Sequence, residues 1–227
     1  MYEKFGQFID GNWSPSENEE TYEVINPATE EVLGHASKAS SADVQRALQS
    51  AEQGLKVWRK IPPWQRSYVL RKIADKIREK KDLLAKWMTL ENGKPLAEGI
   101  GETNGAADIF EWNAEETKRI FGQTIESRFE DTRVHVYYQP VGVVAALSPW
   151  NFPLILAARK ISTALAAGCS VIIKPDTITP GIVMELVDIC REWGVPPGAI
   201  NLLSGDPPSI ASQLIQSDII KKISITG

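Results

Sequence analysis

Hydrophobic positions along the chain change their spacing near residue 140. Between residues 41 and 121, apolar residues recur every three or four positions, which is typical of amphipathic helices. The first such helix is expected to start at Ser41, a candidate N-cap, and carries these apolar residues on one face: Val44, Ala47, Leu48, Ala51, Leu55 and Trp58. After residue 140, short apolar runs rich in β-branched residues alternate with helical segments, which indicates buried parallel strands.

Two or three helices are expected before residue 122. Pro62-Pro63 ends the first helix and opens the next, whose helical spacing continues to Gly93, a natural C-terminal stop. A further helix is expected over 97–121. Three glycines weaken its first turns: Gly99, Gly101 and Gly105.

Strands are expected on both sides of this helical part. Residues 8–13 place an Asp-Gly turn between apolar positions, which is a hairpin signal. Residues 22–25 form a second strand that Asn26-Pro27 stops. Residues 123–139 are expected to form an exposed β ribbon. It either projects and pairs with another chain or is an ordinary edge hairpin, and both interpretations stay open.

The pattern after residue 140 predicts the α/β class, with a Rossmann-like open parallel sheet and flanking helices. The expected strands are 141–147, 171–174, 200–203 and 222–225. The expected helices are 154–167, 180–193 and 209–216. We divide the chain into a helical and β-hairpin N-terminal part (1–122), the projecting ribbon (123–140) and the sheet core (141–227).

Composition excludes several classes of protein. Among 227 residues the net charge is −4, which argues against a nucleic-acid partner. Two cysteines give no disulfide framework, and His35 and His135 have no second ligand at metal spacing. No apolar run is long enough to span a bilayer, and the start has no signal region. We therefore expect a cytoplasmic protein without a metal or membrane partner.

Ligands of such a sheet bind at the carboxyl ends of its strands. There, Asn151 lies between Pro149 and Pro153, and its amide suits either an oxyanion or the cap of the next helix. Lys174 suits a ribose hydroxyl or a phosphate, or is simply solvated. The turn at 204–209 leads into a helix N-terminus, an anion site.

Two further groups of residues are interpreted as structural. Cys169 and Cys190 have no evident base or cationic partner, so we interpret them as small packing residues. Six glutamates are expected on a solvated helix face with i,i+4 partners: Glu91, Glu98, Glu102, Glu111, Glu115 and Glu116.

Taken together, the strand-end segments resemble the aldehyde dehydrogenase superfamily. The resemblance rests on Ser-Pro-Trp-Asn-Phe-Pro at 148–153 and on the segments 166–175, 194–201 and 223–227, in the family's order. Glu91-Asn92-Gly93-Lys94-Pro95 and 112–116 are similar to the succinate-semialdehyde dehydrogenase branch. The resemblance covers essentially the whole chain. Its motifs are specific for the superfamily but much less specific for a substrate.

The resemblance implies an NAD(P)+-dependent oxidation of an aldehyde to a carboxylic acid by a cysteine thiolate and a glutamate-activated water. It implies that Asn151 stabilises the oxyanion and that Phe152 lies near the aldehyde. The residues that it places at the cofactor are Leu147, Ser148, Pro149 and Trp150 (a wall), Lys174 (the ribose), Gly205 (the adenine and pyrophosphate turn), and Thr226 and Gly227 (the pyrophosphate and nicotinamide side).

Two departures from the family pattern concern the cofactor. Where many NAD-preferring members have a glutamate for the 2′-hydroxyl, this chain has Thr177, whose hydroxyl can donate to a 2′-phosphate. We predict that NADP is accepted, and whether it is preferred over NAD is left open. Pro207 stands where the family often has a second glycine, and it removes one backbone donor.

The resemblance places the nucleophilic cysteine and the base glutamate beyond Gly227. The chain is therefore expected to be the cofactor-binding half of an aldehyde dehydrogenase, inactive alone, and a homo-oligomer through 123–139. The alternatives are a non-catalytic nucleotide-binding or subunit-pairing module, and an enzyme with other chemistry at Cys169 or Asn151. A sheet that stops at its fourth strand also predicts self-association or poor solubility.

Overall fold

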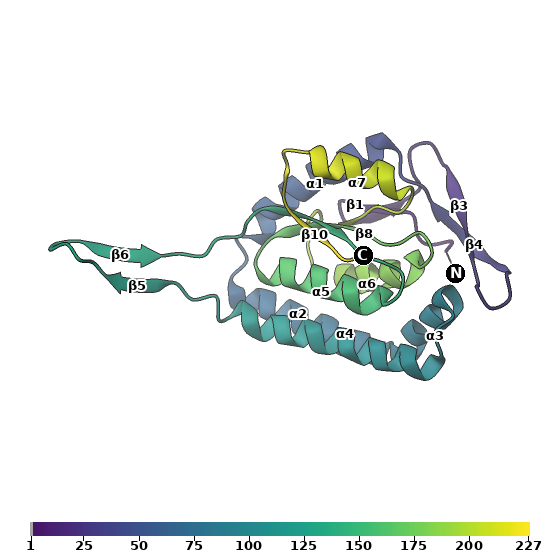
Figure 1. Ribbon diagram of the computed structural model, residues 1–227, viewed down its shortest axis with the longest axis horizontal. Coiled ribbons are helices and arrows are strands. Elements are labelled where there is room, and N and C mark those ends of the chain that lie inside the picture. Colours follow the sequence, from purple (N-terminus) through teal and green to yellow (C-terminus); the bar gives the residue numbers. More distant parts are fainter. Residues whose placement is uncertain (1) are drawn as a thin grey trace.

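The computed structural model describes residues 2–227 as a central sheet with helices on both of its faces (Figure 1). The strands are β1 (Gln7–Ile9), β2 (Asn12–Ser14), β3 (Thr21–Ile25), β4 (Val32–Ser37), β5 (Gln123–Glu126), β6 (Arg133–Val136), β7 (Val143–Leu147), β8 (Ser170–Lys174), β9 (Ile200–Leu202) and β10 (Ile220–Ile225). The helices are α1 (Ser41–Trp58), α2 (Pro63–Glu79), α3 (Lys81–Asn92), α4 (Leu96–Thr117), α5 (Pro153–Ala166), α6 (Pro180–Glu192) and α7 (Pro207–Gln216).

The central sheet has six strands in the order β10-β7-β8-β9-β1-β2. Strands β10, β7, β8 and β9 are parallel, which confirms the expected α/β fold with an open sheet. The N-terminal hairpin β1–β2 extends this sheet, because β1 pairs antiparallel with β9. The sheet is therefore mixed, a feature that the expectation of a parallel sheet did not include.

Alternate residues of the central strands point to opposite helix layers. On one face, Val143, Ala145 and Ile172 pack with apolar residues of α1 and α7. On the other face, Val144, Val171 and their neighbours pack with α2, α4, α5 and α6. Strands β7 and β8 are thus apolar on both sides, as expected. Strand β10 is not, because it forms the sheet edge and is mostly exposed.

Local signals set most of the helix ends, with three corrections. The N-cap of α1 is Ser40 and not Ser41, because Ser40 Oγ accepts from Asp43 N (3.2 Å) in a capping box. The apolar pattern from Pro63 to Gly93 is divided at Lys80 into α2 and α3. Helix α4 ends at Thr117 and not at residue 121.

Positive backbone angles close two of the predicted turns. Gly93 ends α3 with φ +77°, as its position indicates. Asp10 and Gly11 have φ of +51° and +78° and form the tight turn of the β1–β2 hairpin. A separate pair, β3 and β4, packs beside this hairpin end of the sheet (Figure 1).

The ribbon of β5 and β6 extends away from the body of the molecule (Figure 1). The two strands pair antiparallel with each other, and every residue of β5 is exposed. The expected projection of 123–139 is therefore visible in the fold.

Candidate functional site

The carboxyl ends of β7, β8 and β10 lie at one level of the sheet. Leu147 is the register partner of both Lys174 and Ile225. Just beyond this level, Ser148 N donates to the Lys174 carbonyl (3.2 Å) and Thr226 N donates to the Leu147 carbonyl (3.3 Å). The structure therefore brings these sequence-predicted residues together where the parallel strands end. We call this end of the sheet, formed by the residues that follow β7, β8 and β10, the strand-end edge.

Lys174 ends the central strand β8 and is only 5% exposed, so the interpretation as a solvated lysine is wrong. Burial lowers the pKa of its ammonium to about 8, against the opposing influence of Asp176 and Asp206. Within residues 2–227 its Nζ takes part in no hydrogen bond or ion pair. A buried ammonium that needs partners fits a ribose hydroxyl or a phosphate oxygen.

The turn after β9 is held by the N-terminal hairpins. Gln7 binds the Ser204 backbone through two hydrogen bonds, from Nε2 to the carbonyl (3.0 Å) and from Ser204 N to Oε1 (2.8 Å). The Tyr22 and Ser204 hydroxyls are 2.6 Å apart. Gly205 has φ +139°, and a Cβ there would lie 2.8 Å from Ala39 N. This close approach requires glycine.

The start of α7 offers less to an anion than the sequence indicates. Asp206 is its N-cap, and its carboxylate accepts from Ser209 N at 3.0 Å. The next two residues, Pro207 and Pro208, have no N–H to donate. A carboxylate of the chain therefore already caps the helix end at which an anion site was expected.

The loop from Ser148 to Pro153 carries Asn151, Trp150 and Phe152 on an exposed surface. Asn151 Oδ1 accepts from Phe152 N (3.1 Å), and its Nδ2 has no partner within residues 2–227. The cap of α5 is Phe152, so the interpretation of Asn151 as the helix cap is wrong. The amide of Asn151 is thus free to donate to a ligand.

Glu102, a buried residue of α4, satisfies the first amides of α5 instead. Its Oε1 accepts from Leu154 N (2.9 Å) and Ile155 N (3.1 Å). Its Oε2 forms an ion pair with Lys94. Sequence reasoning missed this pair because Glu102 was assigned to a solvated face.

Glu91 of α3 has the same relation to α6. It is fully buried and accepts from Gly181 N (2.7 Å) and Ile182 N (3.1 Å), and the Tyr2 hydroxyl donates to it. Burial raises the pKa of Glu91 to about 7, although these hydrogen bonds favour its ionised form.

The expectation of a solvated glutamate face is therefore wrong for Glu91 and Glu102. Partners of the other glutamates also differ from the expected i,i+4 set. Glu111 and Glu115 form ion pairs with arginines of α2, and Glu116 pairs with Arg119. The two buried residues, Glu91 and Glu102, accept hydrogen bonds at the N-termini of α6 and α5, respectively, at the strand-end edge.

Lys160 of α5 is a further residue that sequence reasoning did not single out. Its Nζ donates to Thr226 Oγ1 at 2.6 Å, so it holds the segment that follows β10. It is largely buried, and burial lowers the pKa of its ammonium. A lysine within the apolar face of a helix is the signal that could have indicated it.

Other chemistry that the sequence raised is not assembled here. Cys169 and Cys190 are buried free thiols, as expected of packing residues, and burial raises the pKa of Cys190. No group of three His, Cys, Asp or Glu within residues 2–227 could hold a metal ion. Each helix in the described part of the chain is too short or too polar to cross a membrane.

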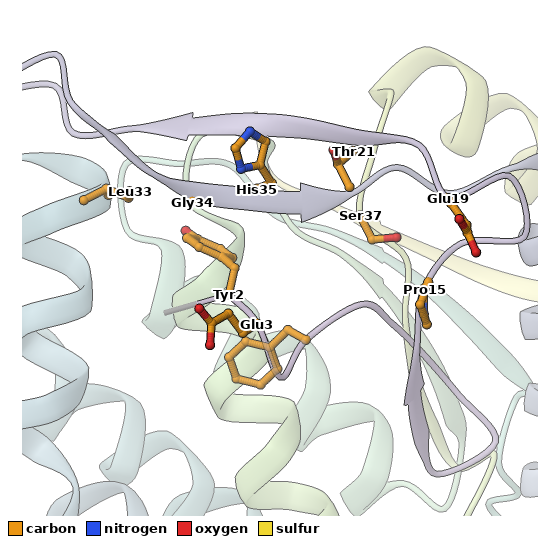
Figure 2. Close-up of a pocket in the computed structure, with 10 residues that line it drawn as sticks. Tyr2, Glu3, Pro15, Glu19, Thr21, Leu33, Gly34, His35 and Ser37 are labelled. Carbon is orange, nitrogen blue, oxygen red and sulfur yellow. The ribbon is translucent and has the colours of Figure 1, made fainter.

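A surface pocket of about 420 Å³ lies elsewhere, at the N-terminal hairpins (Figure 2). Residues 33–37 of β4 form one wall, and Tyr2 and Glu3 lie opposite (Figure 2). None of the residues that line this pocket is one of the sequence-predicted site residues at the strand ends, so we do not include it in the candidate site.

Comparison with known proteins identifies the family. Residues 13–227 match the aldehyde dehydrogenase family. Glutarate-semialdehyde dehydrogenase of Pseudomonas putida is 41% identical over 97% of this chain and 46% of its own length. Succinate-semialdehyde dehydrogenase [NADP(+)] of Escherichia coli is 40% identical over 96% of this chain and 45% of its own length.

Solved structures give the same result. Succinate-semialdehyde dehydrogenase from Burkholderia pseudomallei superposes with a TM-score of 0.97 at 38% identity, covering 98% of this chain and 46% of that one. Betaine aldehyde dehydrogenase from Staphylococcus aureus, in complex with NAD+, gives 0.96 at 34% identity, with 99% and 45% covered. The chain spans about half the length of the curated relatives it matches. This chain belongs to the aldehyde dehydrogenase family.

Proposed function

We propose that this chain is the cofactor-binding half of an NAD(P)+-dependent aldehyde dehydrogenase that oxidises an aldehyde or semialdehyde to a carboxylic acid. The observation that carries the proposal is the strand-end edge, where the buried, unpartnered ammonium of Lys174 and the free amide of Asn151 follow adjacent strands. The semialdehyde relatives support the substrate class.

Lys174 is the proposed partner of the adenosine ribose, because its side chain is largely buried and has no hydrogen bond or ion pair within the described part of the chain. Gly205 lets the adenine turn approach Ala39, and Thr226 is held at the edge by Lys160. The proposed wall beside the cofactor is Leu147, Ser148, Pro149 and Trp150, and the segment from Thr226 to Gly227 lies on the pyrophosphate and nicotinamide side. When bound, the nicotinamide accepts a hydride.

Asn151 is the proposed oxyanion donor. Its Nδ2 can donate to an aldehyde oxygen as negative charge develops there. Phe152, the next residue, is half-exposed and is the proposed contact for the aldehyde. The nucleophilic cysteine and the base glutamate are proposed to belong to a catalytic half that these 227 residues do not contain. We therefore expect no turnover from this chain alone.

The proposed activity can be tested by joining the chain at Gly227 to the second half of the Pseudomonas putida relative, to give a hybrid enzyme. The hybrid enzyme should reduce NAD or NADP with semialdehydes, whereas the chain alone should only bind the cofactor. Asn151→Ala should lower kcat by about 100-fold to 1,000-fold, which is the usual effect of losing one oxyanion donor. Asn12→Ala, on the exposed hairpin turn, is the matched control. Turnover by the chain alone would contradict the proposal.

NADP is proposed as an accepted cofactor because Thr177, following Lys174, adds no carboxylate at the 2′ position. Named relatives and structures include both NADP(+) and NAD+ enzymes, so the family itself permits either. Titration of the chain with both cofactors tests this. NAD binding about tenfold tighter than NADP, about 1.4 kcal/mol, would count against it.

We also propose that the chain forms a homo-oligomer through the ribbon 123–139. This proposal holds both for an enzyme and for the alternative of a non-catalytic module that pairs subunits. The ribbon 123–139 projects and exposes Ile125, Phe129, Val134, Tyr137 and Tyr138. Exposed apolar side chains on a strand pair favour a second copy of the chain as partner. Light scattering of the hybrid enzyme with and without residues 124–135 tests it, and an unchanged mass would refute it.

A further inference from the structure

Three side chains outside the loop from Trp150 to Ile155 hold its backbone. Asn92 Nδ2 donates to the Trp150 carbonyl (2.9 Å), and Lys94 Nζ donates to the Asn151 carbonyl (3.0 Å). Glu102 accepts from the amides of residues 154 and 155. Backbone groups on both sides of the Asn151 side chain are therefore anchored, and we call these three residues the loop clamp.

The loop clamp is built around a buried ion pair. Lys94 is 8% exposed and Glu102 is 6% exposed, and the two are paired. The ring of Phe152 covers the ammonium, with its centroid 4.0 Å from Nζ. Each member of the pair also forms hydrogen bonds to the loop: Lys94 to the Asn151 carbonyl, and Glu102 to the amides of residues 154 and 155. Such pairs seldom add stability over an apolar pair of similar volume, which leaves geometry as their distinctive contribution.

Asn151 itself has little that fixes it. Within residues 2–227, the one hydrogen bond of its side chain is accepted from the amide of the next residue, Phe152, and the side chain is exposed. Pro149 and Pro153 restrict φ at their own positions, but they do not place the loop relative to the sheet. The direction of the Asn151 amide must therefore come from the anchored carbonyls on its backbone.

We propose that Asn92, Lys94 and Glu102 are positioning residues that aim the Asn151 amide at the strand-end edge. This inference rests on the proposed role of Asn151 as the oxyanion donor. The clamp residues do not touch the aldehyde or the cofactor themselves. They act through the loop, and they explain why the segment between α3 and α4 bears on the chemistry at the end of β7.

The clamp can be tested in the chain itself by NMR relaxation of backbone amides. Rigid backbone has an order parameter of about 0.85, and a flexible loop falls below about 0.6. In Lys94→Met, the amides of residues 150–152 should lose order while the rest of the sheet keeps it. Asn92→Ala, which removes only the contact to Trp150, should give a smaller loss in the same residues. Lys86→Met, at an exposed position of α3, is the matched control.

A double variant separates positioning from general stability. Lys94→Met leaves Glu102 as a buried charge without its partner, so the melting temperature should fall. Lys94→Met with Glu102→Met removes both charges and should recover the melting temperature, yet the loop should remain disordered because its anchors are gone. Recovery of loop order together with the melting temperature would show a structural role only and overturn the proposal.

In the hybrid enzyme, the double variant should lower kcat by up to about 100-fold, as expected for a reacting group misplaced by about 1 Å, with little change in cofactor affinity. If Asn151→Ala leaves kcat unchanged, the proposed role of Asn151 fails, whereas the relaxation result still decides whether the clamp orders the loop. Unchanged order at residues 150–152 in both variants would refute the clamp whatever the kinetics show.

Discussion

The burial of Glu91 should give this protein an unusual dependence of stability on pH. The side chain is fully buried at the start of α6, and its pKa is raised from 4.5 to about 7. Burial is the main cause, because it penalises the carboxylate more than the hydrogen bonds from Tyr2, Gly181 and Ile182 stabilise it.

The sign follows from comparing the folded and unfolded chains. Below pH 4.5 Glu91 is protonated in both states and contributes nothing to the pH dependence. Between pH 4.5 and about 7 the unfolded state releases this proton and the folded state keeps it, so the free energy of unfolding falls as the pH rises. The difference between the pKa of 4.5 in the unfolded chain and about 7 in the folded chain corresponds to a loss of about 3 kcal/mol in the free energy of unfolding, fully present above pH 7.

Urea unfolding, followed by tryptophan fluorescence from about pH 4.5 to about pH 8, measures this effect. Glu91→Gln keeps an oxygen that can accept from α6 but cannot ionise, so its stability should lack this decline. The difference between wild type and variant should change by about 3 kcal/mol across the window. Glu98→Gln, an exposed glutamate of α4, should behave like wild type. Parallel pH profiles for wild type and Glu91→Gln would refute the reasoning.

Three further outcomes are expected. Gly54→Ala should cost about 1–3 kcal/mol because its Cβ would overlap the Gly198 backbone, whereas Gly101→Ala, with open space around it, should gain about 0.5–1 kcal/mol in thermal unfolding. NADP affinity should fall as the pH rises through about 8, where Lys174 loses its charge, and Lys174→Met should abolish this dependence in calorimetric titrations. The 227-residue chain should self-associate through the exposed edge strand β10, and Ile225→Lys should reduce its mass in light scattering; a clean wild-type monomer would contradict this.

Features that depend on neighbouring residues could be predicted from the sequence. The Asp10-Gly11 turn, the helix start at Pro63 and the helix end at Gly93 are each decided by local backbone preferences, and each is confirmed. The apolar runs at β7 and β8 were also sufficient to predict two buried strands. Both faces of these strands are buried, so their sequences are apolar throughout and do not alternate with polar residues.

Features decided by a distant partner could not be predicted in this way. Glu91 and Glu102 look like other glutamates in a charged helical stretch, and only the packing of α3 and α4 against the sheet shows that they are buried. The pairing of β1 with β9 joins residues nearly 200 positions apart. The spacing of apolar residues within a segment does not indicate which distant strand it pairs with. Of the candidate site, sequence reasoning found the residues at the strand ends but not the residues that hold them.

The carboxylates at three helix ends of the strand-end edge bear on where a phosphate could bind. In a typical Rossmann site the pyrophosphate binds the N-terminus of the first helix after the sheet begins. Here Glu102 occupies the N-terminus of α5, Glu91 that of α6 and Asp206 that of α7. A phosphate at any of these ends would have to displace a carboxylate of the chain or face its charge. Among the helix ends that residues 2–227 form, those of α5, α6 and α7 are therefore poor phosphate sites, and the Lys174 side chain is better suited to a phosphate oxygen.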